Sequence, residues 1–329
     1  MTVAGNTVGT PMPRSNWNQT DPTKADYILN REYAYNPNLL DNWYFADPVN
    51  QRGATEYTAE GFCLDRWWFE QWSTISPKVQ IRSGCVAVVC GCTDATDTNS
   101  TYLKQTIVNP SMLAGKTVTF SAKLKNVTGN GNPTLVVSSN ARTVAQPITA
   151  ADANSIVSIT TTLASGITSL YVAIGNYSNA AGKGGFDIEI ESVKLEQGSV
   201  STLVNDVPPK FSEQLLECQR YYIRYGSDGG QWLTGASNGT TLYVPLRLPV
   251  PLRVYPSTAN GGSFNYANVN IYPYVAGGKV EITSLTLTGA SGTQDFMLYA
   301  NHASGEVASK SPGALRFTTG GYVELSAEI

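Results

Sequence analysis

Charged residues, histidine and long apolar runs are all scarce in this sequence of 329 residues. Only 14% of the residues are Lys, Arg, Asp or Glu, whereas about 25% is usual. The formal net charge is −3, which argues against a nucleic-acid-binding protein, because such a protein needs a basic surface to neutralise phosphates. Apolar runs such as Val86–Cys90 fall far short of the ~18 residues of a membrane span, so we expect no membrane insertion.

The first residues also lack the features of a secretory signal. Met1–Pro13 contains neither a charged region nor an apolar region after it, so we expect no such signal. Hydrophobic residues make up 42% of the chain, which is enough to form cores and excludes a disordered chain, a collagen-like fibre and a coiled coil. At ~100–200 residues per domain, the length suggests two domains.

Cysteine and histidine offer little for metal binding or catalysis. The five cysteines are an odd number without a framework spacing, so we expect free, buried thiols in a chain assembled in a reducing cytoplasm. There is no CxxC pair for a zinc site. The one histidine, His302, lies in a polar loop, and no GxSxG, P-loop or HExxH motif is present. We therefore expect a protein that is not an enzyme, although a pair of carboxylates acting as a glycan hydrolase stays open.

Residues 1–37 read as an extended arm. Prolines recur in it and no apolar periodicity is visible, yet Trp17, Tyr27 and Ile28 are apolar side chains in a polar context. A short arm cannot bury such side chains by itself. The arm therefore either docks on a partner or packs against its own domain.

Residues 38–200 have the pattern of a β-sandwich. In Thr117–Lys125 the apolar residues alternate with polar ones and share one face of the expected strand. Phe186, Ile188 and Ile190 alternate in the same way, and the apolar phase then slips to Val193 and Leu195, which predicts a β-bulge. Clusters of Gly, Asn, Ser and Asp separate several such short runs, as in a sandwich or jelly roll.

The rest of the chain reads as a linker and a second β domain. Residues 201–225 contain Pro208-Pro209 and a short helix with Ser212 as N-cap and Phe211 packed on Leu216. Residues 226–329 contain further strands, at Thr240–Val244, Lys279–Leu287, Asp295–Tyr299 and around Val323–Ile329. Pro245 is expected at an edge or a turn. The fold class is thus all-β: an N-terminal arm, a jelly-roll β-sandwich, a short helical linker and a second, C-terminal β-sandwich domain.

Particular segments carry a family resemblance over residues 38–200. Asn38–Phe45, Pro48–Gly53, Asp65–Trp67, Leu113–Lys123 and Glu191–Gly198 resemble, in their order, the carbohydrate-binding-module-like jelly rolls of phage tail fibres and related virion proteins. Trp17–Ile28 is similar to a short arm of phage structural proteins. Glu217–Tyr222, Leu246–Arg253 and Glu324–Ile329 are similar to segments of phage fibre proteins.

The resemblance implies a bacteriophage virion protein, a tail fibre or other receptor-binding appendage that is assembled in the host cytoplasm. It implies attachment to other virion proteins through Trp17, Tyr27 and Ile28, a homotrimer, and binding to a host surface polysaccharide. The alternative is a purely structural virion component, such as a decoration, collar or baseplate part, that binds no glycan.

Aromatic residues are the candidate ligand-binding residues. Adjacent residues of a strand face opposite sides, so Trp67 and Phe69 are expected in the core and Trp68 outside it. Trp68 and Trp72 are either a platform on which a sugar stacks or part of a subunit contact. Three tyrosines are further candidates for the ligand site: Tyr102, Tyr171 and Tyr177.

Glu191 is the one candidate metal ligand. The resemblance places an acidic residue near a structural calcium site at this position, although Asp is more usual there than the Glu of this chain. Asp187, Glu189 and Glu191 also read as a solvated strand face opposite Phe186 and Ile188. No cofactor is required, and a structural calcium ion stays open because its several oxygen ligands converge from different loops.

Overall fold

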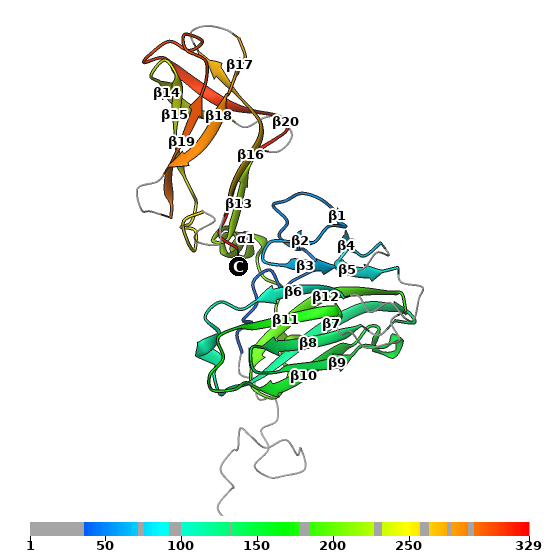
Figure 1. Cartoon of the computed structure of the whole chain (residues 1–329). Coiled ribbons are helices and arrows are strands. Elements are labelled where there is room, and N and C mark those ends of the chain that lie inside the picture. The colour runs from blue at the N-terminus through cyan, green and yellow to red at the C-terminus, as the bar shows by residue number, and fades with distance from the viewer. Residues whose placement is uncertain are drawn as a thin grey trace, which may run out of the picture. The chain divides into compact units, whose positions relative to one another are not determined.

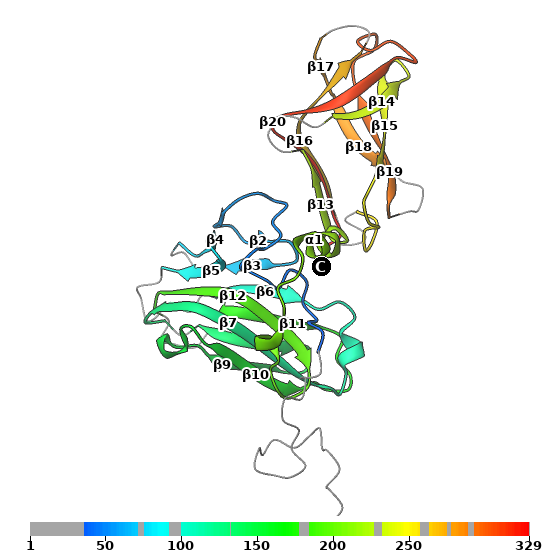
Figure 2. The same cartoon turned by 180° about the vertical axis from the view of Figure 1, so that it is seen from behind.

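The computed structural model describes residues 36–71, 76–91, 100–131, 133–177, 184–226, 232–256, 263–274, 278–288 and 293–328. From Asn38 onwards the described residues belong to one compact unit, Asn38–Ile329. The described residues are mostly strands, which confirms the all-β fold class (Figures 1 and 2). Trp17, Tyr27, Ile28 and Trp72 lie outside the described residues, and the domain boundaries given above stay predictions.

Two antiparallel six-stranded sheets make up the sandwich of residues 38–200. Sheet A has the strand order β1-β4-β5-β12-β7-β10. Its strands are β1 (Glu56–Tyr57), β4 (Lys78–Arg82), β5 (Cys85–Cys90), β7 (Thr117–Gly129), β10 (Ile156–Thr162) and β12 (Phe186–Gln197).

Sheet B has the order β2-β3-β6-β11-β8-β9 and packs on sheet A (Figure 1). Its strands are β2 (Gly61–Phe62), β3 (Trp68–Gln71), β6 (Thr101–Thr106), β8 (Thr134–Ser139), β9 (Thr143–Pro147) and β11 (Leu170–Asn176). The short 3₁₀ turns η1 (Pro110–Leu113), η2 (Ala150–Asp152) and η3 (Leu203–Asn205) lie in the connections.

The core of the sandwich confirms the alternation read from the sequence. Val118, Phe120 and Ala122 of β7 are fully buried, as are Leu103 and Val172 of sheet B. Because side chains of a strand alternate between its faces, each strand gives one face to this core. The other face of each sheet points away from this core.

The predicted β-bulge is present in β12. The register between β12 and β7 shifts on both sides of Ile190. Beyond the shift, Val193 and Leu195 are again fully buried. The extra residue therefore lets β12 keep its apolar side chains in the core although the phase of the sequence changes.

The linker helix begins earlier than expected. α1 (Phe211–Gln219) has Lys210 as its N-cap, and no side chain caps it. The backbone N–H groups of Glu213 and Gln214 both donate to the Lys210 carbonyl, so the first turn closes directly after Pro208-Pro209. The predicted Ser212 cap is wrong, because Ser212 lies inside the helix. Phe211 and Leu216 are both more than 40% exposed, and the contact between them stays a prediction. No helix in the described part of the chain combines the length and apolar character needed to cross a membrane.

The strands after the linker form sheet C. Its order is β17-β16-β20-β14-β15-β19-β18, with β13 also paired to β20. The strands are β13 (Tyr222–Tyr225), β14 (Trp232–Ser237), β15 (Thr241–Arg247), β16 (Ser263–Pro273), β17 (Val280–Glu281), β18 (Ser284–Thr288), β19 (Asp295–Asn301) and β20 (Pro312–Ser326). The strand expected over Lys279–Leu287 is thus two strands, β17 and β18.

Pro245 lies within β15 at a position where this strand is an edge, which confirms its expected place. It is opposite Met297 of β19, whereas β14 pairs with β15 only at Leu242 and Tyr243. The part of β15 that holds the proline is therefore paired along β19 alone. A strand tolerates a proline where one of its sides needs no donor.

Candidate functional site

The outer surface of sheet B carries most of the predicted aromatic residues. Phe69 of β3, Leu103 of β6 and Val172 of β11 enter the core, so their strand neighbours point the other way. We call this outer surface the aromatic face. Its residues are Phe62, Trp68, Glu70, Tyr102, Lys104, Ser138, Tyr171 and Tyr177.

Lys104 lies at the centre of the aromatic face. Strand pairing places it directly beside Trp68. Its Nζ is 2.7 Å from the Glu70 carboxylate and lies 5.6 Å from the Trp68 ring, 6.0 Å from Tyr102 and 5.9 Å from Tyr171. One ammonium group therefore interacts with a carboxylate and with the faces of three aromatic rings.

The Trp68 side chain is held in place and half-buried. Its Nε1 donates to Glu70 at 3.0 Å, and the Phe62 ring meets it edge-on, with the ring centroids 5.1 Å apart. Because Trp68 and Lys104 both bind the Glu70 carboxylate, the position of the indole ring is fixed relative to the ammonium group. The ring keeps accessible apolar area and needs little reordering to accept a ligand.

The three tyrosines form a second cluster beside Lys104. The Tyr177 ring centroid is 5.1 Å from that of Tyr102 and 6.2 Å from that of Tyr171. The hydroxyls of Tyr171 and Tyr177 share a hydrogen bond, and Ser138 Oγ is 3.5 Å from the Tyr177 hydroxyl. Tyr102 is only 8% exposed, so it is the floor of the cluster, and Tyr171 and Tyr177 are its accessible part.

The aromatic face is electrically balanced. Glu70 and Lys104 cancel in charge. Burial raises the pKa of Tyr171 to about 12 and raises that of Tyr102 as well, so both are neutral at pH 7. For Tyr177, burial acts in the same direction, but hydrogen bonds with Ser138, Tyr171 and Thr143 and the charge of Lys104 together outweigh it and lower its pKa. The face thus offers apolar rings, hydroxyl groups and one ion pair, which suits a polar, uncharged ligand with apolar patches.

Glu191 stands apart from this face, on sheet A. Its Oε1 accepts from Lys123 Nζ at 2.7 Å. Its strand neighbours Asp187 and Glu189 both bind Arg82, at 2.8 Å each. Within the described residues no group of three His, Cys, Asp or Glu side chains could hold a metal ion. The carboxylates of β12 thus have cationic partners, and calcium binding by Glu191 stays a prediction.

His302 is buried rather than exposed on its loop. Its Nδ1 is 2.9 Å from the Ala303 carbonyl and its Nε2 is 3.3 Å from Ser237 Oγ. That hydroxyl also accepts a hydrogen bond from the Gly239 N–H. Both side chains are at most 5% exposed, so no substrate reaches this serine, and the contact fastens the loops at the end of β14.

A cavity of about 220 Å³ opens beside Leu39, Ile107, Met112 and Tyr221. Its walls are largely apolar. Arg66 reaches it, but the donors of that guanidinium bond to Asp41, Glu328 and the Thr106 carbonyl. The Arg66 guanidinium is therefore already paired and is no free anchor for a ligand in this cavity.

Sequence reasoning missed Glu70 and Lys104. Each lies two positions from a predicted aromatic residue, so strand alternation places each on the same side as that residue. The missing information was the pairing of β3 with β6 and of β6 with β11. Only this pairing shows that the Lys104 ammonium lies near three aromatic rings at once.

Comparison with known proteins finds distant structural likeness only. No protein-family model matches the chain, and no curated protein does. A solved structure described as "CBM4 structure and function" is 17% identical over 48% of this chain and 99% of its own, with a TM-score of 0.31. The N-terminal CBM22-1–CBM22-2 tandem domain of Xyn10C from Paenibacillus barcinonensis is 12% identical over 89% of this chain and 98% of its own, with a TM-score of 0.28. At these scores the likeness assigns no family.

Proposed function

We propose that this chain binds carbohydrate through the aromatic face of sheet B and that a phage particle displays it. The first part depends on one observation, the convergence of half-exposed rings, phenolic hydroxyls and the Lys104–Glu70 pair on one sheet surface. The second part depends on the sequence resemblance to phage tail fibres and their receptor-binding jelly rolls.

The physical basis of binding is stacking combined with hydrogen bonds. A sugar ring presents C–H groups on its faces, and Trp68 offers the indole area that such a face buries. The hydroxyls of Tyr171 and Tyr177 and the Lys104 ammonium lie within the same surface and supply donors and acceptors for the sugar hydroxyls. A single site of this kind binds weakly, and a homotrimer strengthens attachment through avidity.

Substitution of Trp68 tests the carbohydrate part. The purified protein is measured for retention on host cell walls and on a glycan array, next to Trp68→Ala and Tyr274→Ala. Tyr274 is the matched control, because it is an aromatic residue directly after β16 and is 56% exposed. We expect retention of the unmodified protein and the control, and at least about tenfold weaker binding for Trp68→Ala. Absence of retention, or equal retention of both variants, contradicts the proposal.

A purely structural virion role is the second candidate, and one observation favours it. Large apolar side chains are exposed along residues 200–216 of the described chain: Val200, Val204, Val207, Phe211 and Leu216. Such a stretch is typical of a surface that another subunit covers. Light scattering on Val204→Ser/Val207→Ser separates the two roles: loss of the oligomer with unchanged glycan retention assigns this stretch to subunit contact alone.

Attachment to the particle is proposed for residues 1–37. The support is the resemblance of Trp17–Ile28 to an arm of phage structural proteins. Particles assembled with Trp17→Ala, Tyr27→Ala and Ile28→Ala together are purified and their protein content is measured by mass spectrometry. We expect loss of this chain from the particles while the amount of free protein stays unchanged. Unchanged incorporation overturns this assignment.

A further inference from the structure

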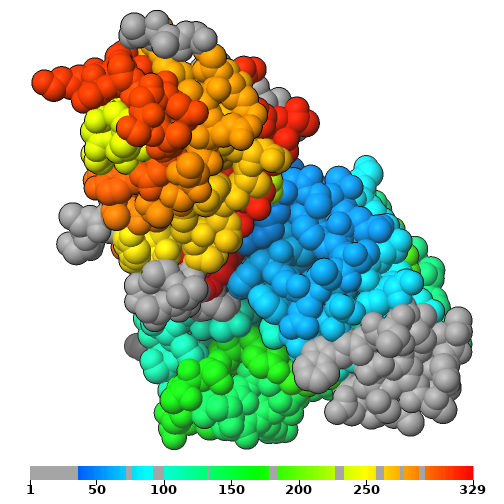
Figure 3. All heavy atoms as spheres, turned by 45° about the horizontal axis from the view of Figure 1, so that its top comes forward, coloured from blue at the N-terminus to red at the C-terminus, as the bar shows by residue number. Residues whose placement is uncertain are grey.

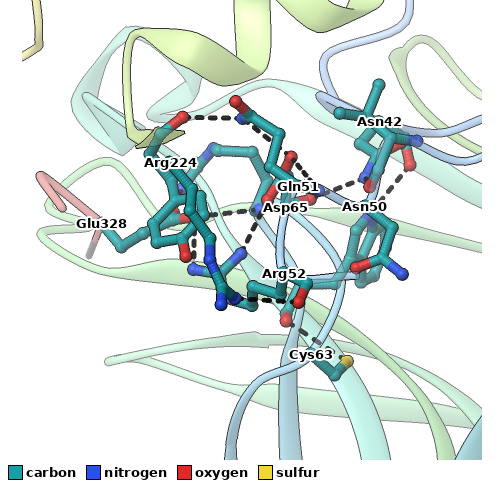
Figure 4. Close-up of polar contacts among 12 residues, drawn as sticks. Asn42, Asn50, Gln51, Arg52, Cys63, Asp65, Arg224 and Glu328 are labelled. Carbon is teal, nitrogen blue, oxygen red and sulfur yellow. Dashed lines mark hydrogen bonds and ion pairs between the residues drawn. The ribbon is translucent and has the colours of Figure 1, made fainter. Parts of the chain in front are cut away.

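Two loops of the sandwich meet the residues that flank sheet C. The first includes Gln51 and Arg52, and the second includes Asp65 and Arg66. They contact Tyr221 and Tyr222 after α1 and Glu328 after β20. In Figure 3 the red C-terminal strand lies against the blue loops, and Figure 4 shows the side chains between them.

Asp65 organises the sandwich side of this contact. Its side chain is fully buried and accepts hydrogen bonds from Arg52 at 2.7 Å and from Gln51 Nε2 at 3.0 Å. The same Gln51 amide donates to the Tyr222 carbonyl at 2.7 Å (Figure 4). One glutamine thereby connects a buried carboxylate of the sandwich to the first residue of β13.

All three nitrogens of the Arg66 guanidinium donate hydrogen bonds at this contact. Nε donates to Asp41 at 2.8 Å, NH1 to Glu328 at 3.0 Å and NH2 to the Thr106 carbonyl at 3.2 Å. Its backbone N–H donates to the other oxygen of Glu328 at 3.1 Å. Glu328 also lies 3.5 Å from Arg52, so this carboxylate faces both arginines.

The tyrosines of the junction cover the two arginines. The guanidinium carbon of Arg52 is 3.8 Å from the Tyr222 ring centroid, and that of Arg66 is 3.7 Å from the Tyr221 ring centroid. The rings exclude water from the charges, which strengthens each ion pair and penalises any charge left unpaired. Side-chain exposure is 1% for Arg66 and 2% for Glu328.

A catalytic role for Asp65 is the alternative reading. Burial raises the pKa of Asp65 to about 7, although Arg52 acts against this rise, and a carboxyl group of that pKa suits general acid catalysis. However, its side chain has no exposed area, and Arg52 and Gln51 donate to its oxygens. No substrate atom reaches the Asp65 carboxyl group, so we assign a structural role to this residue and its partners.

We propose that Arg52, Asp65, Arg66 and Glu328 form a clasp that locks sheet C to the sandwich, so that the two unfold and move as one body. The Ala327 N–H donates to the Tyr221 carbonyl at 2.6 Å, which holds the residue before Glu328 to the residue before β13 on the sheet C side of the clasp. The clasp also borders the aromatic face, because Arg66 precedes Trp68 by two residues and binds the last residue of β6. This inference is independent of carbohydrate binding.

Calorimetry on Glu328→Gln tests the clasp. This variant keeps the shape of the side chain and removes the charge that faces both arginines. Glu281→Gln is the matched control, because Glu281 pairs with Lys279 on the surface of the same sheet. We expect one unfolding transition for the unmodified protein and the control, and two separate transitions for Glu328→Gln. Two transitions in the unmodified protein, or a single unchanged transition in Glu328→Gln, overturn the proposal.

Hydrogen exchange on the unmodified protein tests the same clasp should the variant not fold. The amides of Arg66 and Ala327 lie on opposite sides of the contact. If the clasp opens as a unit, both amides exchange slowly and with the same opening free energy. Exchange of either amide at the rate of an exposed loop overturns the proposal.

Discussion

Lys104 Nζ lies 2.7 Å from the Glu70 carboxylate, in the middle of three aromatic rings. The two residues belong to neighbouring strands, and both are largely covered, with side-chain exposures of 26% and 12%. An ion pair in such a place does more than a surface pair, because losing one partner leaves a poorly solvated charge.

Lys104→Met is expected to lower the free energy of unfolding by about 1–3 kcal/mol, because a buried carboxylate loses its cation. Urea denaturation measures this difference. Lys123→Met is the control, because the pair of Lys123 with Glu191 is more exposed and such surface pairs contribute at most about 1 kcal/mol. Equal losses in the two variants contradict the special position of Lys104.

Gly175→Ala is expected to destabilise the sandwich by more than about 2 kcal/mol, because it combines a steric clash with backbone strain. Gly175 has φ +134, and a Cβ there lies 2.4 Å from the Thr101 carbonyl and 2.8 Å from Tyr102 Cα. Gly166→Ala is the control, since a Cβ at that position meets nothing within 4 Å. Thermal unfolding of both variants checks the prediction, and a stable Gly175→Ala protein contradicts it.

Tyr171→Phe is expected to raise the pKa of Tyr177. The hydrogen bonds from Ser138 and Tyr171 help to hold that pKa down against the effect of burial, and the phenylalanine removes one of them. Ultraviolet titration of the tyrosines measures the change. Tyr299→Phe on sheet C is the control and leaves the titration of Tyr177 unchanged. A lower or constant Tyr177 pKa in Tyr171→Phe contradicts the shared hydrogen bond.

The clasp makes stability depend on pH through Asp65. Its pKa is raised from 3.8 to about 7 in the folded chain, so the folded state binds a proton that the unfolded state has already released. The contribution of this group therefore falls as pH rises from about 4 to about 7, by at most about 1.4 kcal/mol per pH unit.

Comparison with Asp65→Asn isolates that contribution, because other carboxyl groups titrate in the same range. Arg52, Gln51 and Glu328 are the groups that face Asp65, and they stay in the variant. The difference in unfolding free energy between the two proteins is measured by urea denaturation across this window. A difference that does not change with pH contradicts the raised pKa.

Calcium removal is expected to leave the melting temperature unchanged. Glu191 already accepts from Lys123, and Arg82 binds both Asp187 and Glu189. Melting curves in calcium and in a chelator measure this. A higher melting temperature with calcium, lost in Glu191→Gln, instead supports the calcium site that the family resemblance implies.

Sequence alternation was a reliable guide where a strand has one buried face. It placed Trp67 and Phe69 in the core and Trp68 outside, as the structure has them. The prediction of a side-chain cap failed at the start of α1, because a backbone carbonyl, and not a side chain, closes the first turn there. The edge position expected for Pro245 is confirmed, because β14 does not continue beside that part of β15.

The sequence by itself determined which side chains of each strand are apolar, and hence the all-β class, the two faces of β7 and the bulge in β12. Periodicity is a local property, so it needs no knowledge of distant residues. Only the tertiary structure decided that Lys104 serves Trp68 and Tyr171, and that Arg66 binds Glu328 across 262 positions of the chain. These contacts follow from the order and register of strands, which long-range pairing sets and no local pattern records.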